Sequence, residues 1–505
     1  MLTRRELLTR GVSAGAVAAL LPSCLRARRD DGAAVPQALV ETGEWVNDVH
    51  SQLNRTHVLG VEQPTSLEAL QVLVRRAAHE RRAVSICGGR HAMGGQQFGT
   101  DTLLIDLSSF HGVTDFDAER GQVEAGAGTR WPELIADLIE RQRDRAGAWG
   151  IVQKQTGADG LSLGGSLSAN VHGRGLVHRP LVQDVEAFTL VDARGEALRC
   201  SRSENSELFT LAIGGYGLFG VITSVRLRLS PRRKLRRVVE IADVKGLADR
   251  FADRIAHGFL YGDFQYSTDV GSEGLLRTGV FSCYEPVPDD TPIPEGQRSL
   301  SRSDWLDLLE LSHENRAEAF RRYAAHYVST SGQIGWTDSN QLASYIADYH
   351  RELGARIAGL EGGTEMITEL YVPRAELAGF LEAVRADIEA YDMNLIYGTV
   401  RLIERDDETV LAWARESWAC VIFNLHTAHD AAALVVAAEH FRRLIERARE
   451  RGGSYYLTYH RWATREQVLA CHPRLPEFLT LKLQYDPEER FQSDWYRHHR
   501  ALLAG

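Results

Sequence analysis

The residues best suited to chemistry lie in two glycine-rich segments, 88–96 (GGRHAMGGQ) and 164–173 (GGSLSANVHG). Each adjoins apolar, β-prone sequence, and each gathers glycines where a side chain would obstruct a close ligand. Backbone N–H groups that such turns expose form concave anion sites able to hold a pyrophosphate. Two loops of this kind on one chain therefore predict a large phosphorylated cofactor rather than a small metabolite.

A third glycine cluster, residues 215–220 (GYGLFG), has the spacing of a dinucleotide fingerprint. That fingerprint follows a strand and opens a helix. Here the order is reversed, because a helical pattern over 204–213 comes first and a strand pattern over 221–229 follows. The cluster is therefore not expected to bind NAD.

Composition excludes several classes of function. With 505 residues, 44% of them hydrophobic and 25% charged, the chain can bury two ordinary cores. Its 58 basic and 68 acidic residues give a net charge of −10, which disfavours a nucleic-acid partner. The six cysteines are scattered without paired or zinc-type spacing, so neither a disulfide framework nor a metal site is expected.

The N-terminus differs from the rest of the chain. Residues 3–8 (TRRELL) precede an apolar stretch of small residues, 11–21, and resemble a twin-arginine export signal. This predicts a periplasmic or secreted protein that uses the twin-arginine translocase. The alternative is an ordinary basic N-terminus followed by a stray apolar helix. Residues 21–24 (LPSC) also resemble a lipoprotein cleavage box, which makes Cys24 a candidate lipid anchor.

The elements that must position the loops can be predicted from periodicity. A helix is expected to begin at a Ser/Thr cap within 64–68 (PTSLE) and to run to Arg81, and a strand over 83–87 then leads into the first glycine loop. The other elements expected are strands over 103–107, 122–128, 365–372 and 420–425, a helix beginning at Trp131, and helices over 303–323 and 431–451. This alternation predicts an α+β fold with mixed sheets.

The two glycine loops resemble those of the FAD-binding PCMH-type, or vanillyl-alcohol-oxidase, oxidoreductases, in the style of the aldonolactone and alditol oxidases. Residues 420–423 (CVIF), 452–457 (GGSYYL) and 486–494 (DPEERFQSD) are similar to the decaprenylphosphoryl-ribose oxidases of the same fold. The resemblance implies a two-part FAD-binding domain and an α+β substrate domain with an antiparallel sheet. The implied divisions are signal and linker 1–40, FAD domain 41–234, substrate domain 235–470 and a segment closing onto the FAD domain, 471–505.

The resemblance also implies which residues contact FAD. They are Gly88, Gly89, Arg90, His91, Ala92, Met93, Gly94, Gln96, Thr156, Gly157, Ala158, Gly164, Gly165, Ser168, Asn170, His172, Gly173, Gly220, Val221 and Tyr485. His91 stands where the family often bonds a histidine to the C8-methyl carbon of the flavin. Otherwise His91 only contacts FAD or lies beside it. No cysteine falls between Ile151 and Gly175, so a second, cysteinyl bond is not expected.

The catalytic residues depart from the family pattern. The alditol and aldonolactone oxidases carry an acid-x-Arg pair where this chain has Thr399-Val400-Arg401, and their lysine after a tryptophan is missing near 459–464 (YHRWAT). The reaction needs a base for a hydroxyl proton and positive charge near the reduced flavin. The candidates are Tyr459 or His460 for the proton and Arg401 for the charge. Each could instead be structural, and so could His172.

These inferences predict an exported FAD-dependent oxidoreductase. Its expected reaction is hydride transfer to flavin N5 from a CH–OH group of a sugar, polyol, lactone or similar small alcohol, with O₂ or another electron acceptor reoxidising the flavin. Lys482 and Tyr485 are expected to close over the flavin from the C-terminal segment. One alternative is a 2-hydroxy-acid or amine dehydrogenase, in which Arg401 pairs with a carboxylate. The other is a non-catalytic FAD-binding protein.

Overall fold

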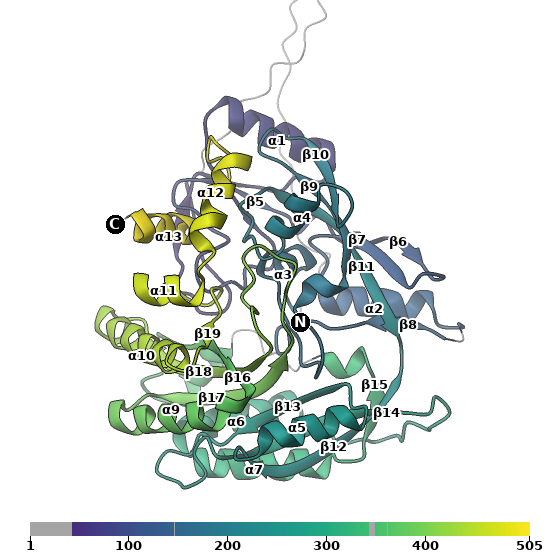
Figure 1. The fold of residues 1–505 in the computed structure, drawn as a ribbon, viewed down its shortest axis with the longest axis vertical. Helices are drawn as coiled ribbons and strands as arrows, with labels where there is room; N and C mark the ends of the chain where they lie inside the picture. The colour runs from purple at the N-terminus through teal and green to yellow at the C-terminus, as the bar shows by residue number, and fades with distance from the viewer. Residues whose placement is uncertain (1–42, 146, 343–348, 361, 505) are drawn as a thin grey trace, which may run out of the picture. The chain divides into compact units, whose positions relative to one another are not determined.

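The computed structural model describes residues 43–145, 147–342, 349–360 and 362–504 (Figure 1). The predicted twin-arginine signal, its linker and Cys24 lie outside the described residues. The described residues fall within a single compact unit, and the domain boundaries at 234 and 470 stay predictions. Within the described ranges, no helix is both long enough and apolar enough to cross a bilayer.

The N-terminal half contains three sheets. A two-stranded antiparallel sheet joins β1 (Glu44–Val46) to β2 (Thr56–Val58). A three-stranded parallel sheet has the order β3 (Gly60–Glu62), β5 (Leu103–Asp106), β4 (Val84–Cys87). A six-stranded antiparallel sheet has the order β10 (Ala197–Ser201), β9 (Val185–Val191), β11 (Val221–Pro231), β7 (Gln122–Gly126), β6 (Val113–Asp117), with β8 (Trp149–Ile151) paired to β11.

Short capped helices connect these strands. α1 (Leu67–His79) begins where the Ser66 hydroxyl accepts a hydrogen bond from the Ala69 amide, as the sequence predicts, and it buries the face carrying Leu70 and Val74. The others are α2 (Trp131–Arg141), α3 (Leu163–Ala169), η1 (Leu181–Asp184) and α4 (Ser206–Ala212). Because α4 ends before the third glycine cluster and β11 begins after it, the reversed order that argued against an NAD fingerprint is present.

The second half is built on one eight-stranded sheet. Its order is β15 (Ile334–Trp336), β12 (Lys234–Asp243), β14 (Thr278–Val287), β13 (Tyr261–Tyr266), β17 (Leu395–Ile403), β18 (Trp418–Ala428), β16 (Gly363–Pro373), β19 (Ser454–Tyr455). Every pairing in it is antiparallel. Together with the helices, this sheet confirms the predicted α+β fold.

The two faces of β16 have different surroundings. Leu370 and Val372 point to the core shared with α9 (Leu377–Tyr391) and α10 (Ala431–Arg449). The alternate residues Glu365, Ile367 and Glu369 line a cavity. Because side chains of a strand alternate between the faces, one strand both anchors the helices and presents polar groups to the cavity.

The remaining helices surround this sheet. They are α5 (Leu247–Ala256), α6 (Arg302–Glu314), α7 (Arg316–Ser329), η2 (Ser339–Gln341), α8 (Tyr349–Arg356) and η3 (Arg374–Glu376). The single helix predicted over 303–323 is two helices, which is a correction. Asn315 leaves helical geometry at φ −151° and ψ 80°, and its side-chain oxygen accepts from the Glu318 amide to begin α7.

The C-terminal segment returns to the N-terminal half. It contains α11 (Arg465–Cys471), α12 (Leu475–Tyr485) and α13 (Asp494–Ala504), which Figure 1 shows in yellow beside the purple and blue elements. The Val84 amide donates to the Arg490 carbonyl at 2.6 Å, and the Gln492 amide donates to the Val84 carbonyl at 2.8 Å. Arg490 also donates to the Ala77 carbonyl at the end of α1. The tail therefore extends the parallel sheet beside the first glycine loop.

Candidate active site

One cavity of about 690 Å³ runs between the glycine loops and the eight-stranded sheet. Its volume lies within the usual range of about 300–1,000 Å³ for small-molecule and cofactor sites. One wall is mostly backbone and glycine, and the opposite wall carries charged and aromatic side chains from the sheet and from α6 and α7. The two walls are described in turn.

The first glycine loop lines the cavity with seven of its predicted residues: Gly88, Gly89, Arg90, His91, Ala92, Met93 and Gln96. A Cβ built on Gly89 would lie 2.7 Å from the Gly160 carbonyl oxygen, so this position has no room for a side chain. Arg90 takes a left-handed φ of 57°, and its guanidinium donates to Asp106 at 2.8 Å. Gly94 lies outside the lining and donates its amide to the Gln96 side chain.

His91 is held in the neutral form. Burial, together with the positive charges of nearby groups, lowers its pKa to about 4, although a hydrogen bond to the Gly160 backbone opposes the shift. The imidazole also packs against this loop, because a Cβ on Gly160 would lie 2.7 Å from His91 Nε2. A neutral imidazole has a nucleophilic nitrogen, and His91 is therefore in the protonation state that covalent attachment requires.

The second glycine segment contributes Gly164, Gly165 and Ser168 from α3, with Thr156, Gly157 and Ala158 from the loop before it. A Cβ on Gly164 would lie 2.9 Å from the Ala127 Cβ, so α3 can pack this closely against the end of β7 only because residue 164 is glycine. Gly220, at φ 151°, adds backbone from the third cluster. These bare surfaces form a cradle that side chains would fill, and they fit a flat, phosphorylated cofactor such as FAD.

Other residues predicted to contact FAD lie outside the cavity wall. Asn170 ends α3 at φ 47° and donates its carboxamide to Asp406 at 2.9 Å. Gly173 and Val221 do not line the cavity, and Val221 is buried in the core beside α1. Tyr485 donates its hydroxyl to Glu207 at 2.5 Å, and Lys482 is buried in an ion pair with Asp486. In this structure, neither Tyr485 nor Lys482 lines the cavity.

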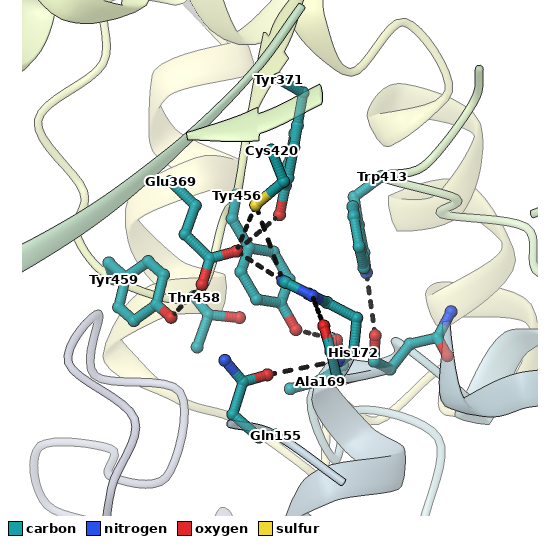
Figure 2. A network of polar contacts seen from close by, with 12 residues as sticks. Gln155, Ala169, His172, Glu369, Tyr371, Trp413, Cys420, Tyr456, Thr458 and Tyr459 are labelled. Atoms are coloured by element: carbon teal, nitrogen blue, oxygen red, sulfur yellow. Dashed lines mark hydrogen bonds and ion pairs between the residues drawn. The ribbon is translucent and has the colours of Figure 1, made fainter. Parts of the chain in front are cut away.

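His172 is buried behind the cavity, where it binds a carboxylate that the sequence reasoning missed. His172 Nε2 lies 2.7 Å from Glu369 Oε2, and His172 Nδ1 lies 3.1 Å from the Gly173 carbonyl oxygen (Figure 2). Both ring nitrogens therefore face acceptor oxygens. His172 joins the second glycine segment to β16, so the two walls of the cavity meet at this pair.

Glu369 is the centre of the network in Figure 2. Its side chain is fully buried, yet the residue lines the cavity. The hydroxyls of Tyr459 and Tyr371 donate to it at 2.6 and 3.1 Å. Burial alone would raise the pKa of Glu369, but the charge and hydrogen bond of His172, the Tyr459 hydrogen bond and the charge of Arg401 lower it to about 2. Glu369 is therefore an ionised acceptor whose charge is stabilised by hydrogen bonds from protein groups.

Glu369 lies in register with Thr399, the position on β17 where the family pattern has an acid. In the register of the sheet, Thr399 pairs with Ile422 on β18, and Ile422 pairs with Glu369 on β16. A buried carboxylate therefore lies two strands away from Thr399, at the same level of the sheet. The signal available in the sequence was a glutamate inside an otherwise apolar strand pattern, since buried glutamates are rare unless paired.

The two candidates for the proton acceptor point in different directions. Tyr459 lines the cavity and donates to Glu369, and burial raises its pKa well above the ordinary value. His460 lies in the core against Phe441 and Trp462 and is absent from the cavity lining. Burial lowers its pKa to about 3, so it is neutral there. Of the two, only Tyr459 can meet a ligand in the cavity.

Arg401 is the least satisfied charge in the cavity wall. It lies on β17, is 4% exposed, and pairs in register with Cys420. Among the described residues, its buried Nε and Nη1 atoms have no hydrogen-bond partner. A buried guanidinium is costly unless it is paired, so this one is suited to an anionic or electron-rich ligand group.

The end of the cavity away from the glycine loops is aromatic. Its lining includes Trp305, Tyr284, Tyr323, Tyr327 and Tyr397. The rings of Tyr323 and Tyr327 lie 4.2 Å apart, and the guanidinium of Arg237 lies 4.7 Å from the Tyr327 ring. Such a wall fits a ring-bearing or extended apolar ligand. This aromatic wall could not be predicted from the sequence, because residues 235–415 carry no recognisable motif.

Comparison with known proteins agrees with this geometry. Residues 58–201, which contain both glycine loops, match the family of FAD binding domains, and this match confirms the predicted resemblance to FAD-binding oxidoreductases. Cytokinin dehydrogenase 5 of Arabidopsis thaliana is 26% identical over 349 residues, 65% of this chain and 62% of that protein. L-gulonolactone oxidase of Bos taurus is 31% identical over 188 residues, 37% of this chain and 41% of that protein.

A third relative extends the match along the chain. Cytokinin dehydrogenase 4 of Oryza sativa subsp. japonica is 30% identical over 378 residues, which cover 69% of this chain and 63% of that protein. The chain thus spans between 41% and 63% of the length of these three relatives. The family model itself covers residues 58–201, in the FAD-binding half.

Proposed function

We propose that this chain, whose FAD-binding domain belongs to the vanillyl-alcohol-oxidase superfamily, is an FAD-dependent oxidoreductase that oxidises a CH–OH group of a sugar, polyol, lactone or similar small alcohol. One observation carries the proposal. Tyr459, the ionised Glu369 and the unpaired Arg401 line the same cavity as the glycine loops of the FAD-binding domain. A cofactor cradle thus faces a proton acceptor and a positive charge.

Tyr459 and Glu369 would remove the hydroxyl proton. When bound, FAD supplies the acceptor for the hydride. As the hydride leaves carbon, the substrate hydroxyl becomes that of a protonated carbonyl, which is a strong acid. The Tyr459 oxygen takes this proton while its own proton passes to Glu369 Oε1 along the hydrogen bond that joins the two oxygens, which lie 2.6 Å apart. A carboxylate with a pKa of about 2 suffices for so acidic a donor.

His172 and Arg401 have different roles in this proposal. His172 is a positioning residue, because it holds Glu369 through Nε2 and lies outside the cavity lining. Arg401 supplies positive charge where negative charge develops, and its unpaired nitrogens are available without breaking an existing bond. If the donor carries a carboxylate, the same guanidinium pairs with it, as a 2-hydroxy acid would require.

His91 would carry the flavin covalently through its ring nitrogen. The neutral imidazole, the tight packing of Gly160 against it and its place in the first loop support this bond. Flavin should then stay with the precipitated wild-type protein after acid treatment, whereas it should be released into the supernatant from His91→Ala. Flavin that moves to the supernatant from the wild-type protein would contradict the bond and leave FAD binding standing.

A second candidate is the dehydrogenation of a CH–NH group on a ring-bearing donor. The aromatic wall formed by Tyr323, Tyr327 and Tyr397 favours it, and so does the longer match to the relatives named cytokinin dehydrogenases. In this reaction the Tyr459–Glu369 pair takes a nitrogen-bound proton instead. The two candidates share the site and differ in the donor.

Anaerobic bleaching of the flavin distinguishes these readings. The protein is mixed with polyols, aldonolactones, 2-hydroxy acids and ring-bearing amines, and the flavin absorbance is followed. Bleaching by the alcohols supports the first candidate and bleaching by the amines the second. If no donor of the panel bleaches a fully loaded flavin, the chain is better described as a non-catalytic FAD-binding protein. Oxygen uptake then tells whether O₂ or another acceptor reoxidises the flavin.

Export through the twin-arginine translocase completes the proposal. Arg4 and Arg5 supply the paired arginines, and Cys24 is the candidate lipid anchor. Replacing both arginines by lysine should retain the loaded protein in the cytoplasmic fraction. Unchanged export of that variant would contradict the twin-arginine route. If Cys24→Ser leaves the membrane-bound fraction of the protein unchanged, the lipid anchor is contradicted.

A further inference from the structure

We propose that His313, Glu365 and His426 form a binding site for a divalent transition-metal ion of the Zn²⁺ class. The three residues come from α6, β16 and β18, and their ligating atoms all lie within 4.8 Å of one another. Their side chains are 5%, 3% and 14% exposed. Two imidazoles and one carboxylate are a common donor set for Zn²⁺. This proposal does not depend on the redox function.

The spacing suits ligands around an ion, and His426 Nδ1 and Glu365 Oε1 are also within hydrogen-bond distance of each other at 3.3 Å. A tetrahedral Zn²⁺ with bonds of about 2.0–2.1 Å places its ligand atoms about 3.3–3.4 Å apart. Glu365 Oε1 lies 3.1 Å from His313 Nε2 and 3.3 Å from His426 Nδ1. The two nitrogens therefore approach the same carboxylate oxygen at distances that a small shift would open for an ion.

The orientation of His313 supports this reading. Its Nε2 atom is buried and has no hydrogen-bond partner among the described residues, although Glu365 Oε1 is only 3.1 Å away. The nitrogen is thus close to the carboxylate but is not aimed at it. Its ring stands at 87° to that of His426, with centroids 5.1 Å apart. This geometry is the one expected if the lone pair of His313 Nε2 is directed at an ion held between His313, Glu365 and His426.

Tyr349 provides the outer partner that metal ligands usually have. Its hydroxyl donates to Glu365 Oε2, while Oε1 is the atom that both histidines approach. The hydrogen bond orients the carboxylate and leaves Oε1 directed at the two imidazoles.

The other cluster of similar composition does not share these features. His172, Glu369 and Cys420 also lie close together, but His172 Nε2 is 2.7 Å from Glu369 Oε2, which is a direct hydrogen bond. Burial raises the pKa of the Cys420 thiol well above its ordinary value, and Tyr459 and Tyr371 also donate to Glu369. That carboxylate is already satisfied by its neighbours.

The proposed ion would fasten α6 to the sheet beside the cavity. Glu365 and Glu369 lie on the same face of β16, four residues apart, which is about 13 Å along a strand. The ion is therefore too far from Glu369 to take part in its proton transfer. Its role is to hold the wall of the cavity that α6 supplies through Trp305 and Leu309.

Metal analysis of the purified full chain tests the site. The protein is freed of metal with a chelator, dialysed against Zn²⁺, and assayed for zinc per chain. The wild type and the control His257→Gln, which removes an exposed histidine beside Asp253, should retain one Zn²⁺. His313→Gln, His426→Gln and Glu365→Gln should each bind Zn²⁺ at least tenfold more weakly. Unchanged FAD content and circular dichroism show that the variants are folded.

X-ray absorption at the zinc edge identifies the ligands. The proposal predicts nitrogen and oxygen neighbours only. A Zn–S distance near 2.3 Å would instead place the ion at Cys420 and overturn the assignment. It would also be overturned if the wild type retained no zinc, or if the three variants retained as much as the control. Zinc should further raise the melting temperature of the wild type but leave that of His313→Gln unchanged.

Discussion

The two walls of the cavity place their working residues in different ways. On the FAD-binding side, the contacts come from runs of neighbouring residues, such as Gly88 to Met93. On the sheet side, they come from single positions on separate segments, Glu369 on β16, Arg401 on β17 and Tyr459 after β19. The first wall is made of residues that are neighbours in the sequence, whereas the second forms only when the strands of the eight-stranded sheet pair in register.

The largest effect is expected on the local wall, from Gly89→Ala. The added methyl would lie 2.7 Å from the Gly160 carbonyl oxygen, and backbone on either side would have to move. We expect the purified variant to lose essentially all bound FAD, measured by absorbance after removal of free cofactor. Gly379→Ala in α9 is the matched control, because its nearest neighbour is a flexible arginine atom at 3.9 Å. Equal FAD content in both variants would contradict the cradle.

On the sheet wall, Arg401→Met should separate activity from stability. Loss of the only unpaired guanidinium nitrogens described in this wall should slow anaerobic flavin reduction by about 10²–10³-fold. The melting temperature should change little, because the cost of burying an incompletely paired guanidinium is removed together with its favourable charge interaction with Glu369. A variant that reduces its flavin at the wild-type rate would exclude Arg401 from the site.

A smaller effect is expected in the pH dependence of folding stability, to which buried histidines of the two regions contribute. Burial lowers the pKa of His460, His472 and His499 to about 3 each, and all three follow β19, whereas the FAD loops contribute His91 at about 4. The unfolded chain takes up protons below pH 6.5, while these native sites stay neutral. Stability should therefore fall as the pH falls from about 6.5 towards 3, by about 2 kcal/mol per histidine at pH 5.

Thermal unfolding at a series of pH values measures this slope. His460→Gln should flatten it, because one of the histidines that burial holds neutral in the folded protein is removed. The control His257→Gln removes an exposed histidine and should leave the slope unchanged. A slope that the His460 substitution does not alter would mean that this histidine is not held neutral in the folded protein.

Much of the fold could be predicted, and the limits have a physical cause. The Ser66 cap, the strand leading into Gly88 and the α4–β11 order around Gly220 depend on neighbouring residues, and the sequence displays them. Glu369 was missed because its role depends on β18 standing between β16 and β17, and no local pattern encodes that order. Asn315 divides a predicted helix through a side-chain cap inside an otherwise helical pattern.

The proposed metal site shows the same limit more strongly. The sequence predicts no metal centre because the expected signals are short spacings between cysteines or histidines. His313, Glu365 and His426 are separated by more than fifty residues each, on a helix and two strands. Only the packing of α6 against the sheet brings them within reach of one ion.

The most direct test of the proposed function is the rate of anaerobic flavin reduction in Glu369→Gln, with the best donor of the panel. The amide keeps the shape of the side chain but can no longer accept the proton that Tyr459 passes on. Reduction should slow by about 10²–10⁴-fold with FAD content unchanged, while Glu382→Gln, an exposed carboxylate on α9, should match the wild type. Reduction of Glu369→Gln at the wild-type rate would contradict the proposed active site.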